Sequence, residues 1–163
     1  MDDCAAVARQ LGRRPRAFRR VAVRCPWGRP AVTEQWPYDE AGRPFPTTYY
    51  LTCPHLVAQV SRLEAAGGVD RWSRAAAADP QLAESVERAT EEQLRLRGEL
   101  AELLGGAHGP PSSGGIGGSG NRLGLKCLHA HVAYALARPG YVLGERVAAE
   151  LEPLWPEACC TAD

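Results

Sequence analysis

The hydrophobic pattern of this chain changes its period at Pro54. Before that residue, three short segments rich in Val, Thr and Tyr are bounded by Pro and Gly, at residues 17–25, 31–36 and 46–53. Segments of this kind are typical of β-strands joined by turns, so we expect a small antiparallel sheet of about three strands in the N-terminal third. From Pro54 onward, apolar residues recur at helical spacing. The chain is therefore predicted to be an α+β protein.

Helical segments with recognisable ends account for most of the remaining residues. One is expected at 3–11, where Gly12 is suited to end it. The longest, of about 24 residues, should begin after an N-cap at Asp79. Further helices are expected from Pro54 to about residue 66, and at about 70–79, 121–138 and 142–151. We expect four to five helices to pack on the sheet, in a single domain that comprises residues 1–163.

Two segments are predicted to lie outside the packed elements. Residues 105–120 are rich in Gly, Pro and Ser and should form a flexible loop. This loop contains GIGGSG, which has the glycine spacing of dinucleotide-binding proteins, but a long helix and GPPSS stand where that motif requires a strand. The motif therefore does not favour a dinucleotide cofactor. Residues 152–163 should form a frayed C-terminal tail.

The charge of the chain argues against nucleic acid as a general partner. It has 19 basic and 19 acidic residues, so its net charge is +0. No run of 18 apolar residues is present, and the N-terminus has no hydrophobic segment of the kind that directs secretion. We therefore expect a cytoplasmic protein that does not associate with a membrane.

Five arginines are concentrated in one short segment, RRPRAFRR at 13–20. A guanidinium group can donate two parallel hydrogen bonds to the oxygens of one phosphate. This segment is therefore a hypothetical site for phosphate, polyphosphate or nucleic acid. The alternative is a solvent-exposed basic connector ahead of a strand. The residues concerned are Arg13, Arg14, Arg16, Arg19 and Arg20.

Cysteine and histidine form the second unusual pattern. The chain has six Cys residues, and in the cytoplasm such clusters more often bind metal or do redox chemistry than form disulfides. Within the helix expected at 121–138, Cys127 and His131 are four residues apart and share one face. Cys25 and Cys53 each end a predicted strand, and Cys53 also precedes a helix, whose dipole favours a thiolate.

These residues predict a metal site. The expected ligands are Cys25, Cys53, Cys127 and His131, with His129, Cys159 or Cys160 as alternatives for the fourth ligand. Three thiolates and one imidazole suit zinc, which we favour, and four thiolates would also hold an iron–sulfur cluster. The ion would be structural or regulatory. No C-x-x-C pair is present, and isolated cysteines are also common in apolar cores, so inert cysteines are the alternative.

Two other classes of function remain open. A small enzyme or redox protein could use a thiolate at Cys53 or Cys127 as its nucleophile. Alternatively, the cysteines are inert and the domain is a metal-free interaction module. The carboxylates of the helix after Asp79 are spaced to pair with arginines on the same helix, so they do not predict catalytic acids.

Four blocks of the sequence resemble a known family. They are LGRRPRAFRRVAVRCPWGRPAV, GRPFPTTYYLTCP, RLEAAG and NRLGLKCLHAHVAYALA, in the order and approximate spacing of the domain-of-unknown-function family 501, over about residues 8–140. The blocks include Cys25, Cys53, Cys127 and His129. Members often have a DRVKCLHA-like block, from which NRLGLKCLHA departs by an insertion before Lys126.

The resemblance implies a cytoplasmic protein of high-GC Gram-positive bacteria. Genes of this family often lie beside those of a septum-formation-initiator-like protein and an exopolyphosphatase. A partner in cell division, or a role in phosphate metabolism, is implied by that association alone. The resemblance implies no particular activity.

Overall fold

A computed structural model, which describes residues 2–106 and 114–160, confirms the predicted α+β fold. The sheet consists of β1 (Phe18–Arg24), β2 (Pro30–Gln35) and β3 (Tyr49–Leu51). The helices are α1 (Asp3–Leu11), α2 (Pro54–Ala65), α3 (Gly68–Ala78), α4 (Pro80–Leu103), the 3-10 helix η1 (Ile116–Gly118), α5 (Leu128–Ala137) and α6 (Val142–Ala148). The described residues thus form six α-helices, one in each segment where a helix was expected and slightly more than the four to five expected to pack on the sheet.

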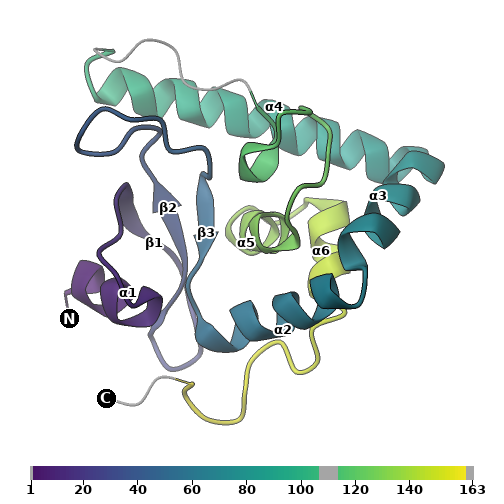
Figure 1. The fold of residues 1–163 in the computed structure, drawn as a ribbon, viewed down its shortest axis with the longest axis horizontal. Coiled ribbons are helices and arrows are strands. Elements are labelled where there is room, and N and C mark those ends of the chain that lie inside the picture. Colours follow the sequence, from purple (N-terminus) through teal and green to yellow (C-terminus); the bar gives the residue numbers. More distant parts are fainter. Residues whose placement is uncertain (1, 107–113, 161–163) are drawn as a thin grey trace.

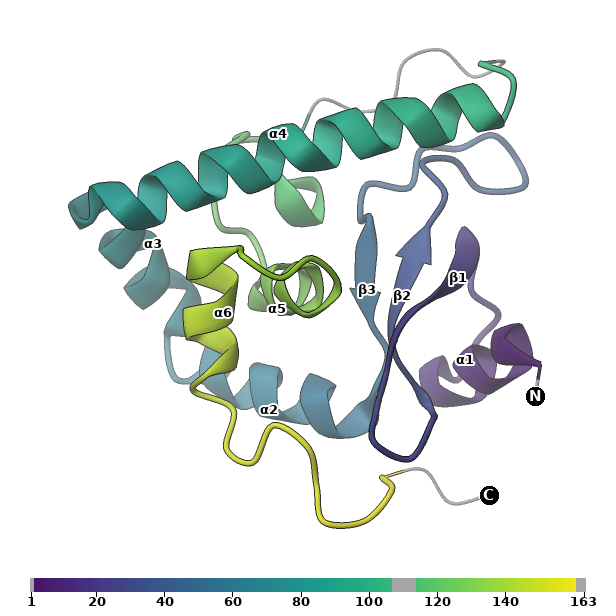
Figure 2. The same ribbon diagram turned by 180° about the vertical axis from the view of Figure 1, so that it is seen from behind.

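The sheet is antiparallel throughout, with the strand order β1-β2-β3. In the central strand, Thr33 pairs with Val21 on one side and with Tyr50 on the other. Figure 2 shows β1 at the outer edge of the sheet, close to α1. The other edge strand, β3, contacts α5. The sheet therefore meets the helical part of the molecule mainly through β3.

Helix α5 forms the centre of the helical part. Figure 1 shows it nearly end-on between β3 and α6, with α4 above it and α2 below. It contacts β3, α2, α6 and η1, and its buried residues are Leu128, Ala130, His131, Val132, Ala133, Tyr134 and Ala135. A helix that is buried on nearly all sides is held by all of its neighbours. Side chains at its N-terminal end are thereby held between the sheet and α2.

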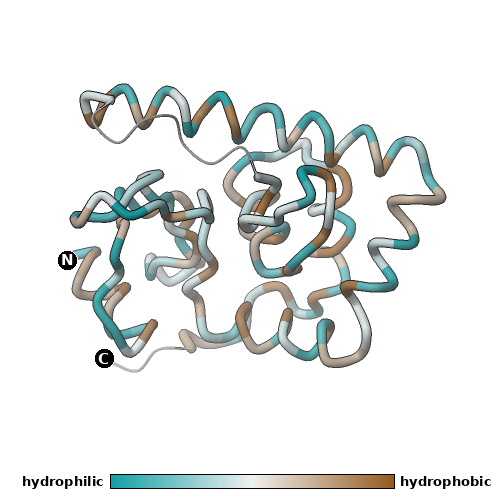
Figure 3. Tube along the Cα trace, turned by 45° about the horizontal axis from the view of Figure 1, so that its top comes forward, coloured by the Kyte–Doolittle hydropathy of each residue, from teal (hydrophilic) through white to brown (hydrophobic). Residues whose placement is uncertain are grey.

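Helix α4 crosses the molecule and has one face on the core. The side chain of Asp79 caps it by accepting a hydrogen bond from the Gln81 amide at 2.9 Å. Figure 3 shows hydrophobic and hydrophilic segments alternating along this helix. Farther along it, the buried Arg97 donates hydrogen bonds to the Phe45 carbonyl at 2.9 Å and to the Thr48 hydroxyl at 3.4 Å. These contacts hold the connection between β2 and β3 against the helix.

Helix α5 begins at Leu128, and the prediction that it begins near residue 121 was wrong. Asn121 starts a turn instead, where its side chain accepts a hydrogen bond from the Leu123 amide at 3.1 Å. Local bonds of this kind compete with helix formation. Cys127 therefore precedes the helix and does not share a helical face with His131.

The two segments predicted to be unpacked lie partly outside the described residues, at 107–113 and 161–163. In the described part of the first segment, Ile116 is buried and η1 contacts both α5 and α4. The described part of the C-terminal tail runs below α2 in Figures 1 and 2. There the Pro153 carbonyl lies 2.9 Å from Nε2 of His55. Both described parts therefore contact the rest of the domain.

Candidate metal centre

The strand order separates the two cysteines that follow β1 and β3. Strands β1 and β3 run parallel with β2 between them, so Cys25 and Cys53 lie at the same end of the sheet but two strand spacings, roughly 10 Å, apart. The donor atoms that bind one zinc ion lie within about 4 Å of one another, and among the described residues neither of these two sulfur atoms belongs to such a group. The expectation that these cysteines share an ion overlooked the strand that lies between them.

Cys53 is the N-cap residue of α2, but its thiol is not activated there. The side chain is buried, and this burial, together with a contact from Cys160, raises the pKa of the thiol to about 11. The two sulfur atoms lie 3.5 Å apart. Burial thus outweighs the helix N-terminus, and Cys53 is protonated at neutral pH, contrary to the thiolate that its position predicts.

His131 lies in the interior between α5 and α6. Its side chain is fully buried, and its Nδ1 lies 2.7 Å from the hydroxyl of Tyr141. Burial lowers the pKa of the imidazole to about 4, so the ring is neutral at pH 7. The structure therefore gives His131 a packing role at this interface.

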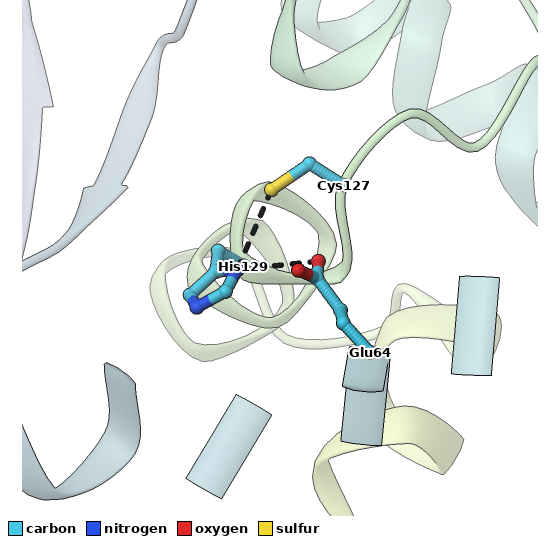
Figure 4. A group of neighbouring side chains, drawn as sticks. All are labelled: Glu64, Cys127 and His129. Atoms are coloured by element: carbon cyan, nitrogen blue, oxygen red, sulfur yellow. Dashed lines mark hydrogen bonds and ion pairs between the residues drawn. The ribbon is translucent and has the colours of Figure 1, made fainter. Parts of the chain in front are cut away.

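One group of side chains among the described residues has the types and spacing of metal ligands. It consists of Glu64, Cys127 and His129, whose donor atoms all lie within 4.8 Å of one another. We call these three residues the ligand group. As Figure 4 shows, Nδ1 of His129 faces both partners, at 3.5 Å from Cys127 Sγ and 3.2 Å from Glu64 Oε1. The other predicted ligands do not belong to a group of this kind among the described residues; they are Cys25, Cys53, His131, Cys159 and Cys160.

Backbone contacts hold the ligand group in place. Glu64 lies in the last turn of α2, and its Oε1 accepts a hydrogen bond from the Leu128 amide at 2.7 Å. That amide is one of the N–H groups that the start of a helix leaves without a helical partner. Cys127 is the extended N-cap residue of α5 and makes no side-chain cap bond itself. Glu64 therefore caps α5 from a neighbouring helix and is thereby held beside Cys127 and His129.

The second ring nitrogen of His129 faces α2. This Nε2 lies 3.3 Å from the Val57 carbonyl and 3.2 Å from the Ser61 hydroxyl. A carbonyl only accepts, so Nε2 carries a proton, and Nδ1 of the neutral ring has a free lone pair. Metal-bound histidines commonly donate their other N–H group to such an acceptor. The contact with Val57 thus orients His129 as a metal ligand would be oriented.

The surroundings of His129 favour a positive charge on its ring. The hydrogen bond with Cys127 raises the pKa of the imidazole most, burial opposes it, and the charges of Cys127 and Glu64 raise it further, to about 9. A protonated ring donates from Nδ1 toward the thiol and the carboxylate. A metal ion bound to the same three atoms would take the place of that proton.

Glu64 and Ser61 were not predicted from the sequence. Charged and hydroxyl residues on a helix usually face solvent, so nothing local distinguishes these two. Two signals point to them: Glu64 belongs to RLEAAG, one of the blocks that carry the family resemblance, and Val57, Ser61 and Glu64 have the spacing of one helix face. Neither signal indicates Cys127 as the partner, because that contact is tertiary.

Two of the five arginines in the segment at 13–20 form ion pairs with a buried carboxylate, and Arg16 lies over the ring of Phe45. Arg19 and Arg20 both bind the carboxylate of Glu34. Arg14 forms an ion pair with Glu40 on the surface, at 2.7 Å. Anion binding by this segment stays a prediction.

The comparisons with known proteins agree with the resemblance seen in the sequence. The chain belongs to the family described as protein of unknown function (DUF501), whose model matches residues 21–149. The matched range contains all three residues of the ligand group. Searches of curated proteins and of solved structures found no match. None of the described helices is long and apolar enough to cross a membrane.

Proposed function

We propose that this protein binds a zinc ion through Glu64, Cys127 and His129. The convergence of a carboxylate, a thiol and an imidazole within 4.8 Å is the observation that supports this most. These are the three kinds of side chain that bind zinc in proteins. With a single thiolate, the ligand group suits zinc better than an iron–sulfur cluster, which four thiolates usually hold.

The separations of the donor atoms fit a tetrahedral ion. With bonds of about 2.3 Å to sulfur and about 2.0 Å to nitrogen and oxygen, a tetrahedral zinc has edges of about 3.5 Å (S to N) and about 3.3 Å (N to O). Cys127 Sγ and His129 Nδ1 are 3.5 Å apart, and His129 Nδ1 and Glu64 Oε1 are 3.2 Å apart. Binding would therefore require little movement along these two edges.

Three protein ligands leave one position of a tetrahedral zinc open to water or another molecule. Cys127 and His129 line a cleft of about 580 Å³, from which a fourth ligand could reach the ion. Open positions are typical of catalytic zinc, whereas structural zinc usually has four protein ligands. The ion would therefore polarise a bound water or carbonyl group, and it would also link α2 to the start of α5.

A thiolate-dependent activity at Cys127 is the second candidate. The 3.5 Å contact with His129 Nδ1 favours it, because an imidazolium stabilises a neighbouring thiolate. In nucleophilic triads, however, the third residue binds the other nitrogen of the histidine. Here Glu64 and Cys127 share the same nitrogen. The arrangement therefore favours metal binding over nucleophilic catalysis.

Calorimetric titration of the metal-free full chain with zinc tests the main proposal. We expect the parent to bind one zinc per chain. Cys127→Ser and His129→Gln should each bind zinc at least about 100-fold more weakly. Cys4→Ser and His55→Gln replace the same residue types outside the ligand group and should bind zinc like the parent. Absence of zinc binding by the parent, or undiminished binding by the two ligand variants, would refute the proposal.

Alkylation with iodoacetamide, followed by peptide mass spectrometry, distinguishes the two candidates. If Cys127 binds zinc, bound zinc should protect it, and a chelator should restore its reactivity. If Cys127 is instead a catalytic thiolate, it should react rapidly whether or not zinc is present, and His129→Gln should slow the reaction.

A further inference from the structure

Two cysteines from distant parts of the chain meet where the C-terminal tail passes the start of α2. Cys53 is the N-cap residue of α2, and Cys160 belongs to the described part of the tail. Both are free thiols, and their sulfur atoms lie 3.5 Å apart. The sulfur atoms of a disulfide are about 2.05 Å apart, so an approach of roughly 1.5 Å would join them. The two thiols are therefore nearly in position to form a disulfide.

Contacts along the tail hold Cys160 in this place. Figures 1 and 2 show the tail below α2, running back toward the end of that helix that adjoins the sheet. The Pro153 carbonyl lies 2.9 Å from Nε2 of His55, in the first turn of α2. Leu154 and Trp155 are partly buried against the hydrophobic core. The tail is thus packed on the domain ahead of its cysteine.

The two thiols differ in their access to solvent. Cys53 is 2% exposed, whereas Cys160 is exposed. Burial, together with the neighbouring thiol, raises the pKa of Cys53 to about 11, so this thiol is protonated at neutral pH. The thiolate is the reactive form of cysteine. A reagent from solution therefore meets Cys160 first, and the thiol nearest to the product is that of Cys53.

Metal binding does not account for this pair. Zinc sites in proteins have at least three protein ligands. In residues 2–106 and 114–160, Cys53 and Cys160 belong to no group of three close ligand side chains. Two adjacent thiols without a third ligand are suited to thiol–disulfide exchange.

We propose that Cys53 and Cys160 form a reversible disulfide by exchange with a small-molecule disulfide, for which oxidised glutathione is the probe. The Cys160 thiolate attacks one sulfur of the probe, whose S–S bond breaks, and one glutathione leaves as its thiolate. Cys53 then loses its proton, and its sulfur attacks Sγ of Cys160 and releases the second glutathione. The cysteine pair is oxidised by two electrons, and the two glutathione thiols carry away those electrons and the two protons.

The disulfide would fasten the tail to the start of α2. Pro54, the residue after Cys53, and Val57 in the next turn both line the cleft beside the ligand group. The inference does not rest on the proposed zinc site, because neither Cys53 nor Cys160 belongs to the ligand group.

The test incubates the reduced, metal-free full chain with mixtures of reduced and oxidised glutathione, and peptide mass spectrometry identifies the disulfides. We expect one disulfide, between Cys53 and Cys160, which dithiothreitol reverses. Cys160→Ser changes an exposed residue, so the chain should fold but form no disulfide. Cys159→Ser and Cys127→Ser should form the disulfide like the parent. In concentrated urea, its equilibrium constant should fall about tenfold or more, because the fold no longer holds the two thiols together.

The outcomes decide between this pair and other thiol chemistry. Absence of a disulfide, or glutathione that remains on Cys160 while Cys53 stays a thiol, would overturn the inference. So would a disulfide that persists in Cys160→Ser and is lost in Cys159→Ser, because Cys159 would then be the partner. An equilibrium constant that urea leaves unchanged would show that the fold does not favour the pair. Loss in Cys160→Ser alone, with the expected decrease in urea, supports the inference.

Discussion

Glu34 and Glu64 are both held by contacts from neighbouring elements, but the charges around them differ. Glu34 is 2% exposed and binds Arg19 and Arg20 of the adjacent strand, while the Tyr49 hydroxyl donates to it at 3.2 Å. Burial alone would raise the pKa of the Glu34 carboxyl, but the hydrogen bond and charge of Arg20 and the charge of Arg19 lower it below its usual value. The negative charge of this carboxylate is thus neutralised by two guanidinium groups.

Glu64 has no comparable guanidinium among its described partners. It accepts from the Leu128 amide and contacts the His129 ring, and the Cys127 thiol lies beside them. A carboxylate, a thiol and a ring nitrogen thus converge, and the positive charge available among these three groups is a proton on the ring. The Glu34 cluster is paired with two fixed guanidinium charges, whereas the charge that balances Glu64 is a proton on His129, which a bound cation could replace.

Glu34→Ala should produce the largest loss of stability. It removes the acceptor of Arg19 and Arg20 and leaves the buried Tyr49 hydroxyl without its partner. We expect the free energy of unfolding, measured by urea denaturation, to fall by about 3 kcal/mol. Zinc affinity should stay within about twofold, because the ligand group is a separate site. A loss below about 1 kcal/mol would mean that the Glu34 cluster does not stabilise the sheet as described.

His131 should make stability depend on pH. Its pKa is lowered to about 4 from an ordinary value of 6.5, so between these values the unfolded chain binds a proton that the folded chain does not. The contribution of His131 to the free energy of unfolding is complete above pH 6.5 and is lost as the pH falls below that value. For the metal-free protein, the free energy of unfolding should lose about 2 kcal/mol from this group between pH 7 and pH 5.

The matched variant for this prediction is His131→Asn, which keeps a polar atom for the Tyr141 hydroxyl but does not titrate. His129, whose pKa is raised, has the opposite pH dependence, but it is present in both proteins and cancels in the difference. Urea denaturation of both proteins at several pH values measures that difference. Parallel profiles for parent and variant would contradict the neutral, buried state of His131.

Two substitutions of Glu64 separate its structural role from its role as a ligand. Glu64→Ala removes the acceptor of the Leu128 amide and should cost about 1 kcal/mol in the metal-free protein. Glu64→Gln keeps an oxygen for that amide and should cost less than about half as much. Both changes should lower zinc affinity by about tenfold or more. Zinc affinity equal to that of the parent in Glu64→Gln would remove Glu64 from the ligand group.

The smallest effect is expected at the surface. Arg14 and Glu40 form an ion pair with side chains 75% and 78% exposed. Exposed pairs contribute little because water screens them, so Glu40→Gln should change the free energy of unfolding by less than about 0.5 kcal/mol. It is the control for Glu34→Ala. Similar losses in the two variants would contradict the distinction between buried and exposed pairing.

The sequence predicted the elements whose ends are determined locally. Gly12 adopts a positive φ of 66° and ends α1, and Asp79 caps α4, which begins at Pro80 as expected. The start of α5 was not predictable in this way. Its Leu128 amide binds a side chain from another helix, so the boundary depends on a contact between distant parts of the chain.

The sequence predicted some, but not all, of the residues that converge in the ligand group. Cys127 and His129 were identified from their residue types and remain in the ligand group. Glu64 was missed because its approach to them depends on how α2 packs beside α5. Cys25 and Cys53 were expected to be ligands because both follow strands, but the order of the strands, which the sequence does not specify, puts β2 between them.

X-ray absorption at the zinc edge of the zinc-loaded full chain tests the central claim most directly, because it counts the sulfur ligands. We expect one sulfur at about 2.3 Å, with the remaining ligands nitrogen or oxygen at about 2.0 Å. The sulfur should disappear from the spectrum of Cys127→Ser and persist in that of Cys4→Ser. Two or more sulfur ligands would point back to the larger cysteine site expected from the sequence. A spectrum without sulfur would contradict the ligand group outright.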